Sequence, residues 1–266
     1  MPIISTSGID LHYERTGRGQ TVLLLAGMAS DSASWNPVVS ELSKNAELIR
    51  MDNRCAGQTR PVPTDTSRSL MVDDVLALLD ACDIEQTVLV GHSMGALIAW
   101  AVAAKAPDRI KAVIAASAPF TVDYARIDLF NTLARLRTND NEADWFRLLF
   151  QFLFSASFFT DERSVVKAIE ASMAYPFKQS ADAFAKQCAA LPSFLEPIDL
   201  PVELPFPALA LTGANDKLFT PADLQKNYEA YSQVSLSVIE NAAHSVHWEN
   251  PIAFNQRVGT FLSELS

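Results

Sequence analysis

Cysteine is scarce in this chain of 266 residues, which contains three: Cys55, Cys82 and Cys188. They are odd in number and far apart, so no pair has the spacing of a metal site or of a disulfide framework. We expect reduced thiols, as in a cytoplasmic protein, and no metal site.

Hydrophobic runs of membrane-spanning length are also missing. No uninterrupted apolar stretch is long enough for a transmembrane helix. The first six residues, MPIIST, show neither the charged nor the apolar region of a signal peptide. We therefore expect no membrane partner and a cytoplasmic location.

Positive charge is in deficit. The chain has 21 Lys and Arg against 31 Asp and Glu, a net charge of −10. A nucleic-acid-binding surface needs a basic patch, so we expect no nucleic-acid partner. Hydrophobic residues make up 49% of the chain, so we expect a folded globular protein and not a disordered one. No repeat or low-complexity tract is visible, and one domain with an insertion is expected.

Strand and helix patterns alternate through both ends of the chain. Apolar runs predict strands at residues 11–15, 21–25, 47–51, 87–90, 110–116, 208–212 and 236–239. Helical spacing predicts helices at 37–42, 69–79, directly after Ser93, at 222–231 and at 252–265. Strands separated by helices imply a mostly parallel sheet flanked by helices, an α/β fold.

The alternation stops between residues 121 and 200, where only helical patterns occur. Eleven of the fifteen phenylalanines lie between Phe120 and Phe194. We expect residues 121–200 to form a helical insertion between the two parts of the core, residues 1–120 and 201–266. Most of these phenylalanines should fill the interior of the insertion, and a minority should line a pocket.

A nucleophile motif stands between a predicted strand and a predicted helix. Gly91-His92-Ser93-Met94-Gly95 follows the strand at 87–90 and opens the next helix. A sharp strand-to-helix turn exposes a serine hydroxyl, and glycines allow the two elements to crowd together. The pattern is weak by itself, but this context predicts Ser93 as a nucleophile.

A base for this serine must come from four histidines. His12 lies in an early predicted strand, and the side chain of His92, adjacent to Ser93, should point away from the serine hydroxyl. His244 follows the strand at 236–239, at the sheet edge expected to carry Ser93. We predict His244 as the base in preference to His247, and the pair lacks the third ligand of a metal site.

The third member should be a carboxylate at the same edge. Asp216 follows the strand at 208–212 and precedes a helix start at Thr220-Pro221. Considered alone, Asp216 could equally be an ordinary turn residue. With Ser93 upstream and His244 downstream, it fits the chain order Ser, Asp, His of such triads.

Two backbone N–H groups should bind the developing oxyanion. One is that of Met94, at the start of the helix after Ser93. The other should come from the loop after the strand at 21–25, where Met28 is the candidate.

These motifs resemble the α/β-hydrolase fold family over essentially the whole chain. The similarity rests on the Ala26-Gly27-Met28 loop with Trp35 behind it, the 52–57 loop, the serine turn, Gly213-x-x-Asp216 and Ala243-His244. Within the family, the chain looks most similar to small esterases and enol-lactonases of the 3-oxoadipate type. The resemblance implies an α/β-hydrolase core of residues 1–120 and 201–266, with residues 121–200 as its inserted helical cap.

The chain departs from the family pattern at two loops. The family commonly has His-Gly before the oxyanion residue, where this chain has Ala26-Gly27. The family's Arg-Gly-x-Gly loop reads Arg54-Cys55-Ala56-Gly57 here. We interpret Cys55 as a small structural residue, because no base is placed for it.

The sequence thus predicts a serine hydrolase for a small, largely apolar carboxylic ester or lactone, with no cofactor. A carbon–carbon bond hydrolase or a thioesterase could use the same triad, and a ligand-binding receptor or pseudoenzyme could keep the pocket. Phe120, just past a strand end, and Leu218, two residues past Asp216, are the predicted pocket residues. The oligomeric state is not readable from the sequence.

Overall fold

The computed structural model describes residues 2–201 and 203–265, without the side chain of Asn139. Its centre is an eight-stranded sheet in the order β1-β2-β4-β3-β5-β6-β7-β8. β1 and β2 are antiparallel to their neighbours, and the other six strands are parallel. The strands are β1 (Ile3–Thr6), β2 (Ile9–Gly17), β3 (Gln20–Leu25), β4 (Ala46–Met51), β5 (Thr87–His92), β6 (Ile110–Ala116), β7 (Ala208–Gly213) and β8 (Val234–Ile239).

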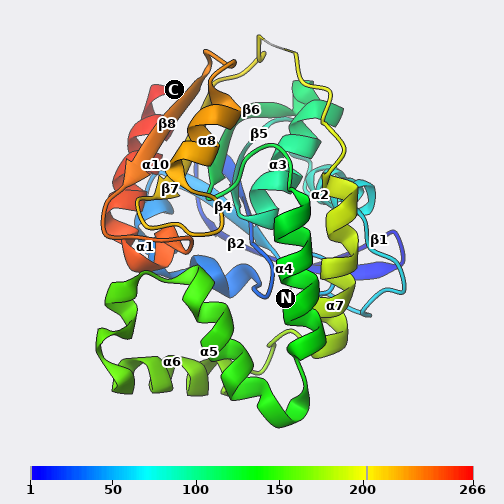
Figure 1. Ribbon diagram of the computed structural model, residues 1–266. Coiled ribbons are helices and arrows are strands. Elements are labelled where there is room, and N and C mark those ends of the chain that lie inside the picture. The colour runs from blue at the N-terminus through cyan, green and yellow to red at the C-terminus, as the bar shows by residue number, and fades with distance from the viewer. Residues whose placement is uncertain (1, 202, 266) are drawn as a thin grey trace.

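Helices cover both faces of this sheet (Figure 1). On one face, α2 (Arg68–Ala81) packs against α3 (Met94–Lys105), and α8 (Pro221–Tyr228) contacts β7 and β8. On the other face, α1 (Asn36–Leu42) packs against α10 (Pro251–Glu264), which follows the short α9 (Val246–Glu249). β3, β5, β6 and β7 lie between these layers, so their side chains are almost all buried, as the apolar runs predicted.

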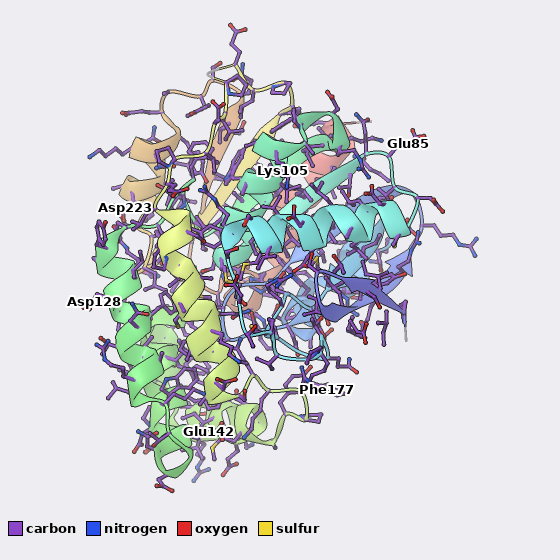
Figure 2. All side chains as sticks on the ribbon, turned by 90° about the vertical axis from the view of Figure 1, so that its right-hand side faces the viewer. Glu85, Lys105, Asp128, Glu142, Phe177 and Asp223 are labelled. Atoms are coloured by element: carbon purple, nitrogen blue, oxygen red, sulfur yellow. The ribbon has the colours of Figure 1, made fainter. Side chains whose placement is uncertain are left out.

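A helical segment, residues 121–200, connects β6 to β7. Its α-helices are α4 (Tyr124–Leu136), α5 (Glu142–Leu153), α6 (Glu162–Ala174) and α7 (Ala181–Ala190). α4 packs against α7, and α5 packs against α6. α5 and α6 form the end of the molecule away from the sheet (Figure 1), where Figure 2 shows Glu142 far from Lys105 on α3.

The predicted fold class is confirmed, with small differences in the elements. β1 was not predicted, and α8 ends at Tyr228 and not at residue 231. Within the described residues of the helical segment no strand is found, as expected. Its division from the core as a separate cap unit stays a prediction.

Candidate active site

Ser93 is the single residue between the end of β5 and the start of α3. Its backbone has φ 53° and ψ −119°, a left-handed conformation that a residue with a side chain rarely adopts. The N–H of Ser93 donates to the carbonyl oxygen of Ala116 at the end of β6, at 2.8 Å. This anchored, strained turn is the geometry that the serine motif predicted.

Two glycines allow the turn because neighbouring backbone lies where a side chain would be. A Cβ at Gly91 would come within 2.3 Å of the carbonyl oxygen of Gly95. A Cβ at Gly95 would come within 2.0 Å of the carbonyl oxygen of Leu25 in β3. Both distances are far below van der Waals contact, so these positions need glycine.

The structure brings Asp216 and His244 together at the same sheet edge. His244 Nδ1 lies 3.0 Å from Asp216 Oδ2, and both side chains are buried. The other oxygen, Oδ1, accepts the backbone N–H groups of Leu218 at 2.8 Å and Phe219 at 3.0 Å. The carboxylate is thus fixed by its own loop and can hold the imidazole in one orientation.

His92 occupies a position that the sequence reasoning did not foresee. Its Nε2–H donates to the carbonyl oxygen of His244 at 2.9 Å, and the two rings are 5.0 Å apart. Burial, followed by the charge of His244, lowers the pKa of His92 to about 3. The side chain therefore remains a neutral donor that braces the loop carrying His244.

His247 lies behind His92, away from the Asp216 contact. Its ring is 4.6 Å from that of His92 and 4.7 Å from that of Trp35. Burial lowers the pKa of His247 well below its ordinary value, and the charges of His92 and His244 add to this. His247 is thus buried among rings at the edge of the cavity described below, and among the described contacts of the two rings only His244 pairs with Asp216. Among the described residues, no group of three or more potential ligands is arranged to hold a metal ion.

The loop after β3 passes directly beside Ser93. A Cβ at Gly27 would lie 3.2 Å from the Cβ of Ser93, so Met28 follows within reach of the serine. Asn53 Nδ2 donates to the carbonyl oxygen of Ala26 at 2.8 Å and fixes the start of this loop. Met94 is the first residue of α3, so its N–H has no acceptor inside the helix. The assignment of these two N–H groups to an oxyanion hole stays a prediction.

The 52–57 loop is held by buried polar pairs. His12 Nδ1 lies 3.0 Å from Asp52 Oδ2, and Arg54 makes a two-pronged contact with Asp74 at 2.6 and 2.7 Å. Cys55 is buried, and burial raises the pKa of its thiol. A protonated, enclosed thiol fits the interpretation of Cys55 as structural.

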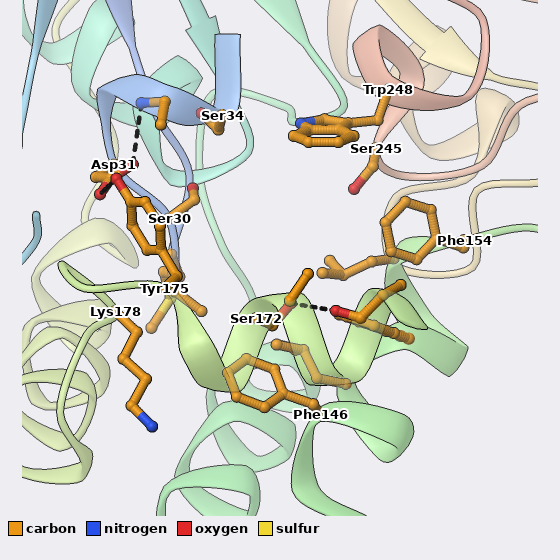
Figure 3. Close-up of a pocket in the computed structure, with 18 of the residues that line it drawn as sticks. Ser30, Asp31, Ser34, Phe146, Phe154, Ser172, Tyr175, Lys178, Ser245 and Trp248 are labelled. Carbon is orange, nitrogen blue, oxygen red and sulfur yellow. Dashed lines mark hydrogen bonds between the residues drawn. The ribbon is translucent and has the colours of Figure 1, made fainter. Parts of the chain in front are cut away.

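A cavity of about 710 Å³ lies between the core loops and the helical segment. In Figure 3, Asp31, Ser34, Ser245 and Trp248 face it from the core, opposite Phe146 on α5. α5 and the turn after it supply most of its apolar wall, namely Phe146, Leu149, Phe150, Leu153, Phe154 and Phe158.

The cavity borders the candidate catalytic groups through their neighbours. Met28, His92 before Ser93 and Ser245 after His244 all line it. Ser93 and His244 are not lining residues, and 7% of Ser93 is exposed. A bound substrate would thus enter between the loops that carry the candidate catalytic groups.

The two predicted pocket residues lie elsewhere. Phe120 stacks edge-on against the rings of Trp100 and Tyr228, 4.7 Å from each, and does not line the cavity. Leu218 is 2% exposed and also does not line it. The chain turns back over α3 after β6, so Phe120 packs against the core, and Leu218 contributes its N–H to Asp216.

Sequence reasoning missed the polar end of the cavity. Asp31 Oδ2 accepts the hydroxyl of Tyr175, just after α6, at 2.8 Å (Figure 3). Burial, followed by the charge of Asp52, raises the pKa of Asp31. This contact joins the loop after β3 to the helical segment. No local sequence pattern predicts it, because the two residues are far apart in the chain.

Comparisons with known proteins identify the family of this chain. A family model for the alpha/beta hydrolase fold matches residues 20–251. A protein of Agrobacterium fabrum whose name describes a candidate carbamate hydrolase, RutD, is 27% identical over 95% of this chain and 98% of its own length. A 2-hydroxy-6-oxononadienedioate/2-hydroxy-6-oxononatrienedioate hydrolase of Paraburkholderia xenovorans is 28% identical over 96% of this chain and 91% of its own length.

A solved structure matches as well. The enol-lactonase from Burkholderia xenovorans LB400 superposes with a TM-score of 0.84 and 25% identity, covering 98% of this chain and all of that one. Among the described residues, no helix is long and apolar enough to cross a membrane. The family match spans most of the sequence and agrees with the observed sheet order: this chain belongs to the α/β-hydrolase fold family of enzymes.

Proposed function

We propose that this chain is a serine hydrolase that cleaves a small, largely apolar carboxylic ester or lactone. Ser93 acts as the nucleophile, His244 as the base and Asp216 as the group that orients His244. The N–H groups of Met28 and Met94 bind the oxyanion. The observation that carries the proposal is the 3.0 Å contact of His244 with Asp216 at the sheet edge where Ser93 occupies its strained turn.

The proposed reaction has two halves. His244 takes the hydroxyl proton of Ser93 as the oxygen attacks the substrate carbonyl, and the tetrahedral oxyanion rests on the two N–H groups. Protonated His244 then gives its proton to the departing alcohol, leaving an acyl-enzyme. A water molecule, deprotonated by His244, releases the acid and restores Ser93.

The cavity supports the substrate class. Six apolar side chains of residues 146–158 form one side of it, and such a surface favours an apolar group over a charged one. The proposed cap role of the helical segment follows, because that segment supplies this wall. The related enol-lactonase adds support for a lactone as well as an open ester.

The direct test is hydrolysis of p-nitrophenyl acetate and butyrate by purified protein. Ser93→Ala should abolish turnover while leaving the thermal melting temperature close to that of the wild type. Ser117→Ala is a matched control, because Ser117 follows the neighbouring strand β6 and is buried. Undiminished turnover in the Ser93 variant would contradict the proposal.

A carbon–carbon bond hydrolase is the second candidate. The Paraburkholderia relative is called a 2-hydroxy-6-oxononadienedioate hydrolase, and hydrolysis of such a keto acid breaks a carbon–carbon bond. Such a reaction would use the same residues on a keto acid. Comparison of kcat/KM for 2-hydroxy-6-oxononadienedioate and for p-nitrophenyl butyrate separates the two. Higher kcat/KM on the keto acid would favour this second candidate.

A further inference from the structure

One carboxylate joins the loop that carries His244 to the helical segment. Glu249, at the end of α9, uses both of its oxygens as acceptors. Its Oε2 accepts the backbone N–H of Ala243 at 2.6 Å, directly before His244. Its Oε1 accepts the backbone N–H of Ser155 at 2.9 Å and the hydroxyl of Ser155 at 2.7 Å.

A backbone bond lies beside this bridge. The N–H of Ser245, directly after His244, donates to the carbonyl oxygen of Leu153 at the end of α5, at 2.9 Å. His244 is therefore flanked by two residues that are tied to residues 153–155, one directly and one through Glu249. The same stretch supplies Leu153 and Phe154 to the wall of the cavity.

The chemistry of these contacts demands a carboxylate at position 249. The donors are two backbone N–H groups and a hydroxyl, and no ion pair of the described residues includes Glu249. An amide at this position has only one acceptor oxygen, so its NH2 group would face one of the two backbone N–H donors. Glutamine would thus keep the size of the side chain and lose one side of the bridge.

We infer that Glu249 is a positioning residue, which holds His244 at its working distance and fixes it to the wall of the substrate cavity. The inference rests on the proposed function, since it assigns His244 as the base. A base must be held within a fraction of an ångström of its working position, and a displacement of about 1 Å can cost about a hundredfold in rate. Loss of the bridge should therefore reduce the chemical step more than substrate binding.

The test compares Glu249→Gln with Glu264→Gln, an exposed position on α10 with the same chemical change. We expect kcat for p-nitrophenyl butyrate to fall about tenfold in Glu249→Gln, with KM changed less than about threefold. Circular dichroism and thermal melting show whether each variant is folded before its kcat and KM are compared. Ser155→Ala removes only the hydroxyl bond and should lower kcat about twofold to threefold, which keeps the test open if Glu249→Gln does not fold.

A folded Glu249→Gln protein whose kcat and KM match those of Glu264→Gln would overturn the inference, even if its melting temperature were lower. For Ser155→Ala, a kcat equal to that of the wild type would do the same if Glu249→Gln did not fold. Ser93→Ala is measured in parallel. If it keeps full turnover, the proposed function fails; if it is inactive while Glu249→Gln is unchanged, only the positioning role fails.

Discussion

His92 donates its Nε2–H to the carbonyl oxygen of His244, 2.9 Å away, so the residue before the candidate nucleophile braces the candidate base. The low pKa of His92, about 3, keeps its ring neutral. A positive charge at this position would oppose the imidazolium that the proposed mechanism forms on His244. A buried neutral histidine supplies the hydrogen bond without that cost.

Replacement of His92 tests this brace. His92→Leu removes the donor and should lower kcat for p-nitrophenyl butyrate about tenfold, since a hydrogen bond of roughly 1 kcal/mol is lost and the base loop is released. His92→Gln retains an N–H donor at similar reach, so its kcat should fall less than that of His92→Leu. Steady-state kinetics on the two folded variants provides the measurement, and a leucine variant as fast as the wild type would exclude the brace.

The fold was largely predictable because the central strands are buried on both faces. The apolar run at 110–116 predicted β6 with its observed bounds, and the run at 87–90 located β5. β1 gives a weaker signal, since it has four residues, alternates between exposed and half-buried positions and pairs only with β2. Edge strands of this kind are stabilised by pairing with a neighbour more than by local sequence.

The site was predictable where it depends on strand ends. Asp216 and His244 each follow a parallel strand, and such ends meet at one edge of the sheet, so their contact could be expected. The roles of His92 and Glu249 could not, because they depend on the path of the loop at 241–249 and on where α5 ends. Phe120 was misplaced for the same reason: its surroundings are set by the return of the chain over α3.

Acid should unfold the protein partly through its buried histidines. His92 and His247 are neutral in the fold because their pKa values are lowered, and they take up protons near pH 6.5 when the chain unfolds. The unfolded state then binds more protons below pH 6.5, so stability is retained above that value and lost as the pH falls. As long as a ring is protonated in the unfolded chain and neutral in the fold, it lowers the free energy of unfolding by about 1.4 kcal/mol for each pH unit of acidification.

His247→Leu should therefore flatten the pH dependence of stability. The free energy of unfolding, measured with urea below about pH 6, should fall less steeply with decreasing pH than it does in the wild type. Above about pH 8 both proteins should show parallel curves, because histidine is neutral in both states. An unchanged slope in acid would show that His247 is protonated in the folded protein.

The size of the cavity should set the range of acyl chains. Ala168 on α6 lines the cavity, and Ala168→Leu places three more carbon atoms into it. We expect KM for p-nitrophenyl hexanoate to rise about tenfold while KM for the acetate stays within about twofold. Ala174→Leu is the matched control, since Ala174 is exposed at the end of the same helix. Equal effects of the two substitutions would indicate that the substrate lies outside this cavity.

The central claim is that Ser93 is an activated nucleophile served by His244. The most direct measurement is reaction of the purified protein with a fluorophosphonate, followed by peptide mapping with mass spectrometry. We expect one adduct, on Ser93, that forms at least about a hundredfold more slowly in His244→Gln. A preparation that hydrolyses esters yet carries the adduct on another residue, or carries none, would contradict it.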